Sequence, residues 1–303
     1  MNLSLPSDRR VIRNLTGIGL PEIPLFGAYK LASAELALPP HTHGEYIEIH
    51  YIKRGLQTFN LHDQLHTLRK NDLFITLPNE EHGTGASPLQ RGTIYWLQLH
   101  APKAAKSLVG LNPGMTGRLL EQLRSVPARH FHATPLVAEL FEDIFQLLNT
   151  PDSPARNSGI TTRLALWLQI VAECAHTPRN QAVTADIKSI LNLIDKDASC
   201  RLTVAALAAK LGFSVASFQR RFQSQTGVSP HHYILDRKIA RAATLLLTTQ
   251  QEITRLANDL GFSSSQHFAT VFKNYTGLTP LAYRNRTYPK RNYPAEERVI
   301  MKK

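Results

Sequence analysis

Hydrophobic and polar positions alternate in short runs over the first hundred residues of the chain. The run Y-I-E-I-H-Y-I spans residues 46–52, and two similar runs, N-D-L-F-I-T-L-P and T-I-Y-W-L-Q-L, occupy residues 71–78 and 93–99. These runs are rich in β-branched and aromatic residues and are separated by Gly, Pro, Asn and Asp, which favours antiparallel strands joined by turns. The pattern predicts a β-barrel or jelly roll over about residues 20–100.

The hydrophobic period changes to that of an α-helix after Thr116. Leucines recur three or four positions apart between residues 119 and 148, and a strongly apolar helix is expected over about residues 160–175. The stretch that precedes this helix, residues 151–159, contains Pro, Ser and Gly and is interpreted as a break. Helices are therefore expected over about residues 116–176.

The last hundred residues contain the same motif twice. Residues 207–214 read L-A-A-K-L-G-F-S and residues 256–263 read L-A-N-D-L-G-F-S; T-G-V-S-P-H-H-Y (226–233) and T-G-L-T-P-L-A-Y (276–283) follow them. Each copy predicts a short helix, a turn and a second helix, because Gly212 suits a left-handed helix end and the serine after the next residue suits an N-cap. This arrangement is a helix-turn-helix, whose second helix enters the major groove of DNA.

A longer helix is expected between the two copies. Ser229 and Pro230 mark its start, and apolar residues continue the helical period to about Leu247. Such a helix is about 27 Å long at 1.5 Å per residue, and successive major grooves on one face of DNA lie about 34 Å apart. One chain is therefore expected to place two reading helices in adjacent grooves.

The outward positions of the two reading helices are the candidate DNA contacts. Phenylalanines four residues apart, Phe218 and Phe222 in the first copy, are expected to face the core and so define the outward face. Arg220 is predicted to contact a base edge, with phosphate as the alternative, whereas Arg221 is predicted to contact phosphate. The candidates are Ser214, Ala216, Gln219, Arg220 and Arg221 in the first copy, and Ser265, Gln266, Thr270 and Lys273 in the second.

Positive charge is concentrated in the part of the chain that contains the repeat. The net charge of the 303 residues is +12; residues 201–303 contain 16 Lys and Arg against 5 Asp and Glu, and residues 1–200 contain 19 against 18. This asymmetry predicts a polyanionic partner, with nucleic acid favoured over an anionic membrane surface. Cys174 and Cys200 stand outside any metal-binding spacing, and neither a signal peptide nor a membrane-spanning run is recognised, so a cytoplasmic protein without a membrane partner is expected.

The predicted barrel contains a motif rich in histidine. His41, His43, Glu48 and Gly55 give the pattern H-x-H-x4-E-x6-G, and His82 follows. The pattern resembles the first motif of the cupin barrel, in which two His, one Glu and a later His hold a divalent metal. Imidazole and carboxylate groups are suitable ligands for such a metal.

The match to the cupin motifs is incomplete. His82 comes one residue early, and glycines of the motifs are replaced by Glu35, Asp72 and Glu80. No cofactor is therefore expected, and a metal on His41, His43, Glu48 and His82 is the alternative. The residues expected to line a pocket for a small molecule are His41, His43, Glu48, His82, Tyr46 and Trp96. No role is predicted for the isolated His50, His100, His130 and His132.

The C-terminal motifs resemble those of the AraC/XylS family of bacterial transcription regulators. The resemblance is carried by the two copies themselves and by R-K-I-A-R-A-A-T-L-L over residues 237–246. It implies a cupin-like effector domain followed by helices that often mediate dimerisation. The base-reading residues that it implies are Ala216, Gln219 and Arg220 in the first copy, and Ser265, Gln266 and Thr270 in the second. Thr270 departs from the family, which usually places Arg there, so the first reading helix is expected to carry more of the specificity.

The resulting prediction is an α+β protein with two domains. An effector-binding and dimerisation domain is expected over residues 1–178, a linker over 179–184, an all-α tandem helix-turn-helix domain over 185–288 and a basic tail over 289–303. The expected function is ligand-responsive transcription regulation, with activation the commoner mode in the family. The expected partners are double-stranded operator DNA, a small-molecule effector and RNA polymerase, with homodimerisation left open. The alternatives are a metal-dependent cupin-type enzyme with an accessory nucleic-acid-binding domain, and an architectural DNA-binding protein without sequence preference.

Overall fold

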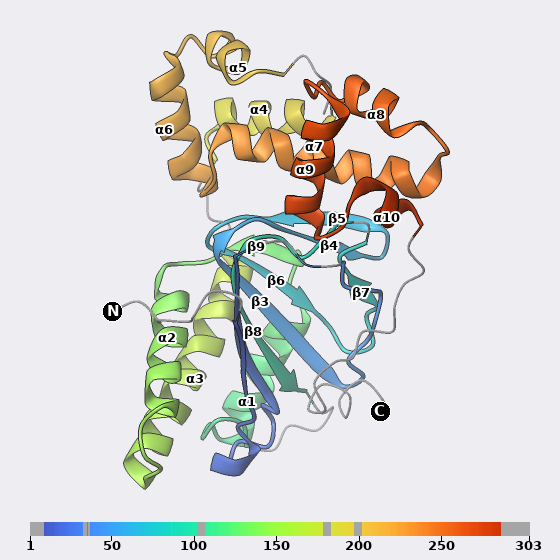
Figure 1. The fold of residues 1–303 in the computed structure, drawn as a ribbon. Coiled ribbons are helices and arrows are strands. Elements are labelled where there is room, and N and C mark those ends of the chain that lie inside the picture. Colours follow the sequence, from blue (N-terminus) through green and yellow to red (C-terminus); the bar gives the residue numbers. More distant parts are fainter. Residues whose placement is uncertain are drawn as a thin grey trace.

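The computed structural model describes residues 9–32, 35, 37–85, 87–101, 107–177, 183–196 and 202–285. A β-barrel with three flanking helices forms the lower part of the molecule in Figure 1, and a helical domain lies across its top. The predicted linker over residues 179–184 falls largely outside the described residues, and the predicted tail over 289–303 falls wholly outside them.

The N-terminal domain is built from two antiparallel sheets. The larger has the strand order β1-β2-β8-β3-β6-β9 and the smaller has the order β5-β4-β7. The strands are β1 (Arg9–Arg13), β2 (Leu25–Leu31), β3 (Tyr46–Gly55), β4 (Gln57–Leu61), β5 (Gln64–Leu68), β6 (Asp72–Thr76), β7 (His82–Gly83), β8 (Gly92–His100) and β9 (His130–His132). The predicted cupin-like β domain is thereby confirmed.

Alternate residues of the central strand β3 face two different cores. Ile47, Ile49 and Tyr51 pack in the apolar cluster shared with the helices, whereas Ile52 packs in the cluster between the two sheets. Because successive side chains of a strand point to opposite faces, Glu48 falls on the face of Ile52. The large sheet is therefore buried on both faces, and a carboxylate points into the barrel.

The helices of this domain cover the outer face of the large sheet (Figure 1). They are α1 (Pro113–Arg124), α2 (Leu136–Leu148) and α3 (Pro154–His176), and a short 3-10 helix spans Thr16–Ile18. The expected break over residues 151–159 was wrong from residue 154 onward, because α3 begins at Pro154. Ser153 caps it by accepting a hydrogen bond from the Arg156 N–H, and proline fits the first helical position.

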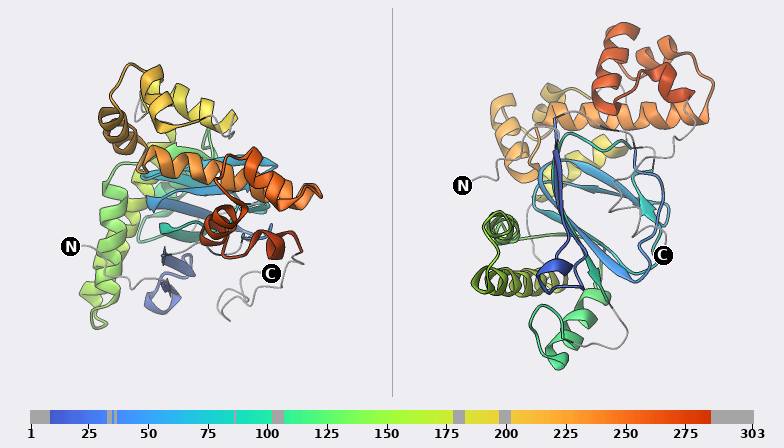
Figure 2. Two further views of the ribbon diagram at one scale, coloured as in Figure 1. Left: turned by 45° about the horizontal axis from the view of Figure 1, so that its top comes forward. Right: turned by 60° about the horizontal axis from the view of Figure 1, so that its bottom comes forward.

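The helical domain repeats one arrangement at the two ends of a long helix. Its elements are α4 (Ala185–Lys196), α5 (Val204–Lys210), α6 (Val215–Thr226), α7 (Pro230–Thr248), α8 (Ile253–Asp259), α9 (Ser265–Thr276) and α10 (Pro280–Arg284). Figure 2 shows α5 and α6 near one end of α7, and α8 and α9 near the other. The 19 residues of α7 correspond to about 28 Å, close to the predicted length.

Local signals set each helix-turn-helix as the sequence predicts. Gly212 (φ +69°) and Gly261 (φ +73°) take the left-handed conformation that glycine favours. Ser214 then caps α6 by accepting from the Ser217 N–H, and Ser264 caps α9 in the same way. The scaffold is thus duplicated down to its caps.

Candidate functional site

The outward face of α6 is polar and accessible. Phe218 and Phe222 are fully buried, and Ala216, Gln219 and Arg220 are exposed. Arg220 makes no hydrogen bond or ion pair with any residue in the described part of the chain. Its guanidinium group therefore remains available to an external acceptor.

Arg221 is oriented differently from its neighbour. Its Nη2 lies 3.1 Å from the Asp186 carboxylate of α4, and its guanidinium lies over the Phe213 ring at 5.4 Å. The Arg221 side chain thus links α6 to the start of α4. Its side chain is 42% exposed and can also reach a phosphate from this position, but unlike that of Arg220 it is already paired.

The corresponding face of α9 has fewer free hydrogen-bond donors. The Thr270 hydroxyl donates to the Gln266 carbonyl oxygen of its own helix at 3.0 Å, and the Ser265 hydroxyl donates to the Gln266 side chain at 3.3 Å. Lys273 is exposed one turn further along. His267, which the sequence reasoning did not single out, is also exposed and pairs with the Ser263 hydroxyl at 3.1 Å.

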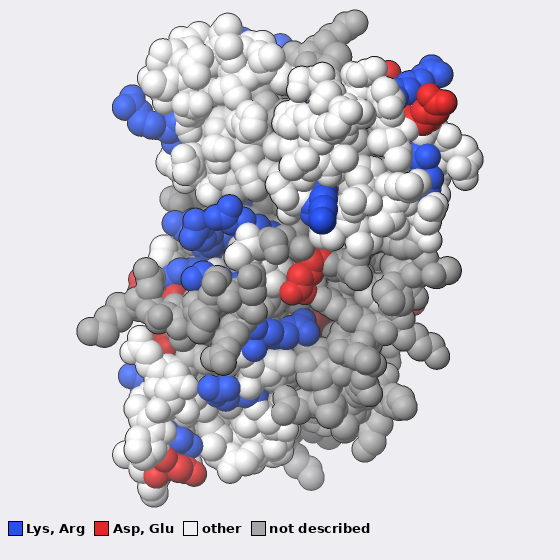
Figure 3. Space-filling view, in the orientation of Figure 1, with Lys and Arg blue, Asp and Glu red and all other residues white. Residues whose placement is uncertain are grey.

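Positive charge is spread over the helical domain and its junction with the barrel. Residues 202–285 contain 9 Lys and Arg against 3 Asp and Glu. On the face shown in Figure 3, the blue side chains gather along the boundary between the two domains and at the edges of the helical domain. The rest of the C-terminal excess belongs to residues outside the described part.

Four of the predicted pocket residues meet inside the barrel. One ligand-type atom each from His41, His43, Glu48 and His82 lies within 4.8 Å of the others. Glu48 Oε2 is 3.0 Å from His82 Nε2 and 3.2 Å from His43 Nε2. His41 and His82 are paired through their backbones, with N–O distances of 2.9 and 3.0 Å, and this pairing brings the two rings together.

Two further residues that sequence reasoning missed complete this cluster. Gln98 of β8 donates from Nε2 to Glu48 Oε1 at 3.0 Å and lies 3.1 Å from His43 Nδ1. His50 Nε2 lies 3.7 Å from Glu48 Oε2. Both residues stand on the inward-facing positions of their strands, because Gln98 is two residues from Trp96 and His50 is two residues from Ile52. The period of two along each strand was the signal that could have found them.

The electrostatics of the cluster follow from its burial. Burial, with the charges of His82 and His43, lowers the pKa of His41 to about 3, and burial lowers that of His50 to about 4. Burial also disfavours ionisation of Glu48, but the surrounding histidines outweigh it and hold its pKa well below the usual range. His82, bonded to Glu48, has a raised pKa despite its burial. At neutral pH the site therefore contains the Glu48 carboxylate together with neutral His41 and His50.

These donors suit a divalent transition metal. Imidazole nitrogen and carboxylate oxygen are the ligands of such ions, with bonds of about 2.0–2.2 Å. His41 and His82 each direct Nδ1 to a backbone carbonyl oxygen, that of Pro39 at 2.8 Å and that of Glu80 at 3.0 Å. Such bonds leave Nε2 to face the cluster, which is the usual arrangement of metal-binding histidine.

The structure does not bring the two predicted aromatic pocket residues into the cluster. The Tyr46 ring lies against His100, at 5.4 Å between ring centroids. Trp96 is 4% exposed and packs against Tyr29 between the sheets, at 5.5 Å between ring centroids. Tyr46 therefore packs against His100, outside the cluster, and Trp96 belongs to the apolar core between the sheets.

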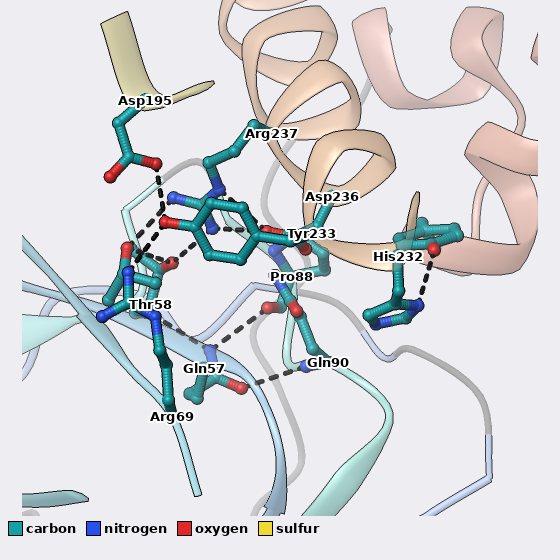
Figure 4. A network of polar contacts seen from close by, with 12 residues as sticks. Gln57, Thr58, Arg69, Pro88, Gln90, Asp195, His232, Tyr233, Asp236 and Arg237 are labelled. Atoms are coloured by element: carbon teal, nitrogen blue, oxygen red, sulfur yellow. Dashed lines mark hydrogen bonds and ion pairs between the residues drawn. The ribbon is translucent and has the colours of Figure 1, made fainter. Parts of the chain in front are cut away.

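The barrel and the helical domain meet through a polar network on α7 (Figure 4). Arg237 donates from Nη1 to Thr67 at 3.0 Å and from Nη2 to Thr58 at 3.2 Å, and it also pairs with Asp236. The Tyr233 hydroxyl, which lies beside it, accepts from Arg69 Nη2 at 2.8 Å. The network therefore joins α7 to strands β4 and β5 and to the turn after β5.

Apolar packing reinforces this junction. Leu56 of the barrel is 2% exposed and packs in the same cluster as Phe222 and Tyr233. A Cβ at Gly227 would lie 2.5 Å from Lys70 Cβ, so the two backbones approach as closely as glycine allows. The first helix-turn-helix unit and the barrel thus share one hydrophobic core.

Two comparisons with family sequence models decide the affiliation of the chain. A family described as the AraC-like ligand binding domain matches residues 32–171, and one described as a helix-turn-helix domain matches residues 207–286. A curated relative, regulatory protein SoxS of Salmonella typhimurium, is 35% identical over 100 residues, which are 33% of this chain and 94% of that protein. The chain belongs to the AraC family of transcriptional regulators.

Two other curated relatives match longer stretches of the chain. The Msm operon regulatory protein of Streptococcus mutans is 25% identical over 243 residues, 78% of this chain and 83% of that protein. The HTH-type transcriptional activator RhaR of Pectobacterium carotovorum is 33% identical over 127 residues, 40% of this chain and 45% of that protein. The two family models make the chain a DNA-binding regulator with an N-terminal ligand-binding domain.

The AraC-family assignment places the reading helices in a DNA-binding domain and the histidine cluster in a ligand-binding domain. The helix-turn-helix match contains α6 and α9, and the ligand-binding match contains the histidine cluster. Within the described residues, no helix combines the length and the apolar character needed to cross a bilayer.

Proposed function

We propose that this regulator reads an asymmetric operator, with α6 supplying most of the base discrimination and α9 mainly positioning the domain. The observation that carries the proposal is the contrast between Arg220 and Thr270. The first is exposed without a described partner, whereas the hydroxyl of the second is bonded to its own helix. Equivalent positions of the repeat therefore offer unequal hydrogen-bonding capacity.

The chemistry of α6 supports direct readout. Arginine can bond both O6 and N7 of guanine, and glutamine can bond both N6 and N7 of adenine. Gln219 and Arg220 are adjacent and exposed, and each good bidentate pair gives about 1–3 kcal/mol of discrimination. Ala216 would add apolar contact with a thymine methyl group. Ser214 and Arg221 would contact the DNA backbone.

The chemistry of α9 supports positioning rather than readout. Lys273 supplies a single charge suited to phosphate, and Gln266 is its best remaining base-reading side chain. Ser265 and Thr270 are short and already hydrogen-bonded within the helix. Phosphate contacts fix orientation on the duplex without carrying sequence information.

We further infer that the histidine end of the barrel is the effector pocket and that β4 couples it to the DNA-binding domain. Leu61, at one end of this five-residue strand, pairs with His82 of the cluster. Thr58, three residues earlier, accepts the hydrogen bond from Arg237. A strand rises about 3.4 Å per residue, so the two sites are about 10 Å apart along one rigid element. An effector that shifts β4 would change how α7 is held.

The remaining partners follow from the family. We propose RNA polymerase as the partner in activation, a second copy of the chain as a partner through α2 and α3, and the cytoplasm as the compartment. Leu136 and Leu166 are exposed on these helices, at 42% and 46%. A metal-dependent enzyme remains the rival function, and reproducible turnover that disappears in Glu48→Gln would establish it.

Selection of binding sites from random duplexes by the full-length protein tests the proposed function. We expect a site of about two helical turns, with strong base preference in one half and weak preference in the other. Equal preference in both halves would contradict the asymmetry. A flat profile over all positions would instead identify an architectural DNA-binding protein.

A further inference from the structure

We propose that the barrel binds one divalent transition-metal ion through a ring nitrogen each of His41, His43 and His82 and the carboxylate of Glu48. The proposal deepens the effector pocket of the proposed function and makes the ion part of that pocket. The proposal rests on the geometry of this chain. The sequence alone predicts no metal, because the chain departs from the cupin motifs.

Convergence is the first observation that carries the proposal. The ring centroids of the three histidines lie 4.5 to 5.1 Å apart, so the imidazoles form a closed triangle. Glu48 Oε2 lies within 3.2 Å of two of them, His43 and His82. Of these residues, His43, Glu48 and His82 are between 2% and 6% exposed. Grouping a carboxylate and three imidazoles away from water is costly unless a cation or hydrogen bonds compensate.

The spacing is close to that of a coordination shell. Bonds of about 2.1 Å place opposite ligand atoms at most about 4.2 Å apart. The four donor atoms lie within 4.8 Å of one another. A contraction of about half an ångström therefore closes the shell, which rotation of the imidazole rings can provide.

The surrounding residues hold the ligands from outside. His41 and His82 are oriented by backbone carbonyl oxygens, and Gln98 bonds the Glu48 oxygen that faces away from His82. Such partners fix the ring orientation of ligands and raise metal affinity. The backbone pairing of His41 with His82 also explains how a histidine one residue early in the motif still reaches the cluster.

The cluster is also left with unsatisfied polar atoms. Gln98 Oε1 and His50 Nδ1 are buried and lack a hydrogen-bond partner within the described part of the chain. Buried polar groups are almost always paired, directly or through water or an ion. Water bound to an ion in the cluster would supply a partner for Gln98 Oε1.

The donor set defines the class of ion. Three imidazoles and one carboxylate suit Zn²⁺, Fe²⁺, Co²⁺, Ni²⁺ or Mn²⁺, whereas Mg²⁺ and Ca²⁺ prefer oxygen ligands. With three neutral imidazoles and one carboxylate, a bound divalent ion leaves the site with a net charge of about +1, which favours an additional anionic or polar ligand on the ion. Metal and effector can then occupy the pocket together.

The test uses full-length protein without a histidine tag, stripped with chelator, loaded with Zn²⁺ or Co²⁺ and desalted. We expect one retained ion per chain by elemental analysis, and a rise in Tm of about 5 °C when free Zn²⁺ is a hundredfold above its Kd. With Co²⁺, the visible spectrum should report nitrogen and oxygen ligands.

Matched variants decide whether the retained ion occupies this site. His82→Gln should lose the ion and the Tm rise, whereas His231→Gln, at an exposed position of α7, should keep both. Glu48→Gln, which keeps the side-chain size, replaces His82→Gln if circular dichroism shows that the latter is unfolded.

Two results would overturn the proposal: a wild-type protein that retains no ion, or retention that persists in both His82→Gln and Glu48→Gln. In the first case Glu48 is satisfied by His82 and Gln98 alone. An asymmetric site in the duplex selection, obtained alongside either result, would leave the proposed DNA-reading function standing and reject only the metal.

Discussion

The two helix-turn-helix units share a scaffold and differ in what surrounds it. The core of the second unit is drawn entirely from α7 to α10 and the turns between them. The core of the first unit also contains α4 and Leu56 of the barrel. Duplicated caps and phenylalanine pairs therefore make the same local fold twice, whereas among the described residues only the hydrophobic core of the first unit includes a barrel residue. The first unit, which contains the unpaired Arg220, is therefore also the unit that packs against the barrel.

Replacing the equivalent core phenylalanines should show most clearly that the two helix-turn-helix units differ in their contact with the barrel. Phe222→Ala and Phe272→Ala should each cost about 3–5 kcal/mol of local stability, because both side chains are fully buried. Hydrogen exchange should then rise in α4 to α6 and at the β4–β5 edge for the first variant, and only in α8 to α10 for the second. Faster exchange at the β4–β5 edge in Phe272→Ala would show that the barrel supports both units equally.

Arg237→Ala tests the junction between the first unit and the barrel. Asp236 is 2% exposed, so removing its partner leaves a buried charge unpaired, with an expected cost of about 3–5 kcal/mol. The hydrogen bonds to Thr58 and Thr67 are lost as well. We expect the calorimetric unfolding of the two domains to separate into two transitions. Arg241→Ala, one turn along the same helix and exposed, should leave the transitions unchanged.

Acid should weaken the barrel side of the same junction. Burial disfavours ionisation of Asp72, but hydrogen bonds from His130 and His132 outweigh it and lower its pKa to about 2. These residues line a cavity of about 670 Å³ that faces Lys188 of α4. Because the folded-state pKa lies below the unfolded value near 3.8, stability on the order of 2 kcal/mol is present above pH 4 and lost toward pH 2.

The measurement for this prediction is the urea midpoint between pH 6 and pH 2. Wild type should lose stability across this range more steeply than Asp72→Asn, which has no carboxylate to protonate. Parallel pH profiles for the two proteins would show that ionisation of Asp72 does not contribute to the loss of stability in acid.

Local signals made the helical domain predictable, and alternation along the strands made the barrel predictable. The glycine turns, serine caps and phenylalanine pairs act within a few residues, so the sequence alone places them. The start of α3 was missed because Pro154 was interpreted as a helix breaker, although proline fits the first turn of a capped helix.

Contacts between distant segments could not be predicted in this way. The cupin-like spacing predicts that His41, His43, Glu48 and His82 lie together. Gln98, in contrast, reaches Glu48 only through the pairing of β3 with β8. Arg237 and Thr58 are 179 residues apart, and no period or cap connects them. The interface between the domains therefore emerges only from the folded structure.

The most direct test of the unequal roles of α6 and α9 is a mismatch scan of the selected operator. The affinities of wild type, Arg220→Ala and Thr270→Ala are measured at constant salt for every single base-pair change. We predict that Arg220→Ala removes about 1–3 kcal/mol of discrimination at one base pair in one half-site. Thr270→Ala should change no position by more than about 0.5 kcal/mol. Equal losses in the two half-sites, or uniform weakening on all duplexes by Arg220→Ala, would contradict the account.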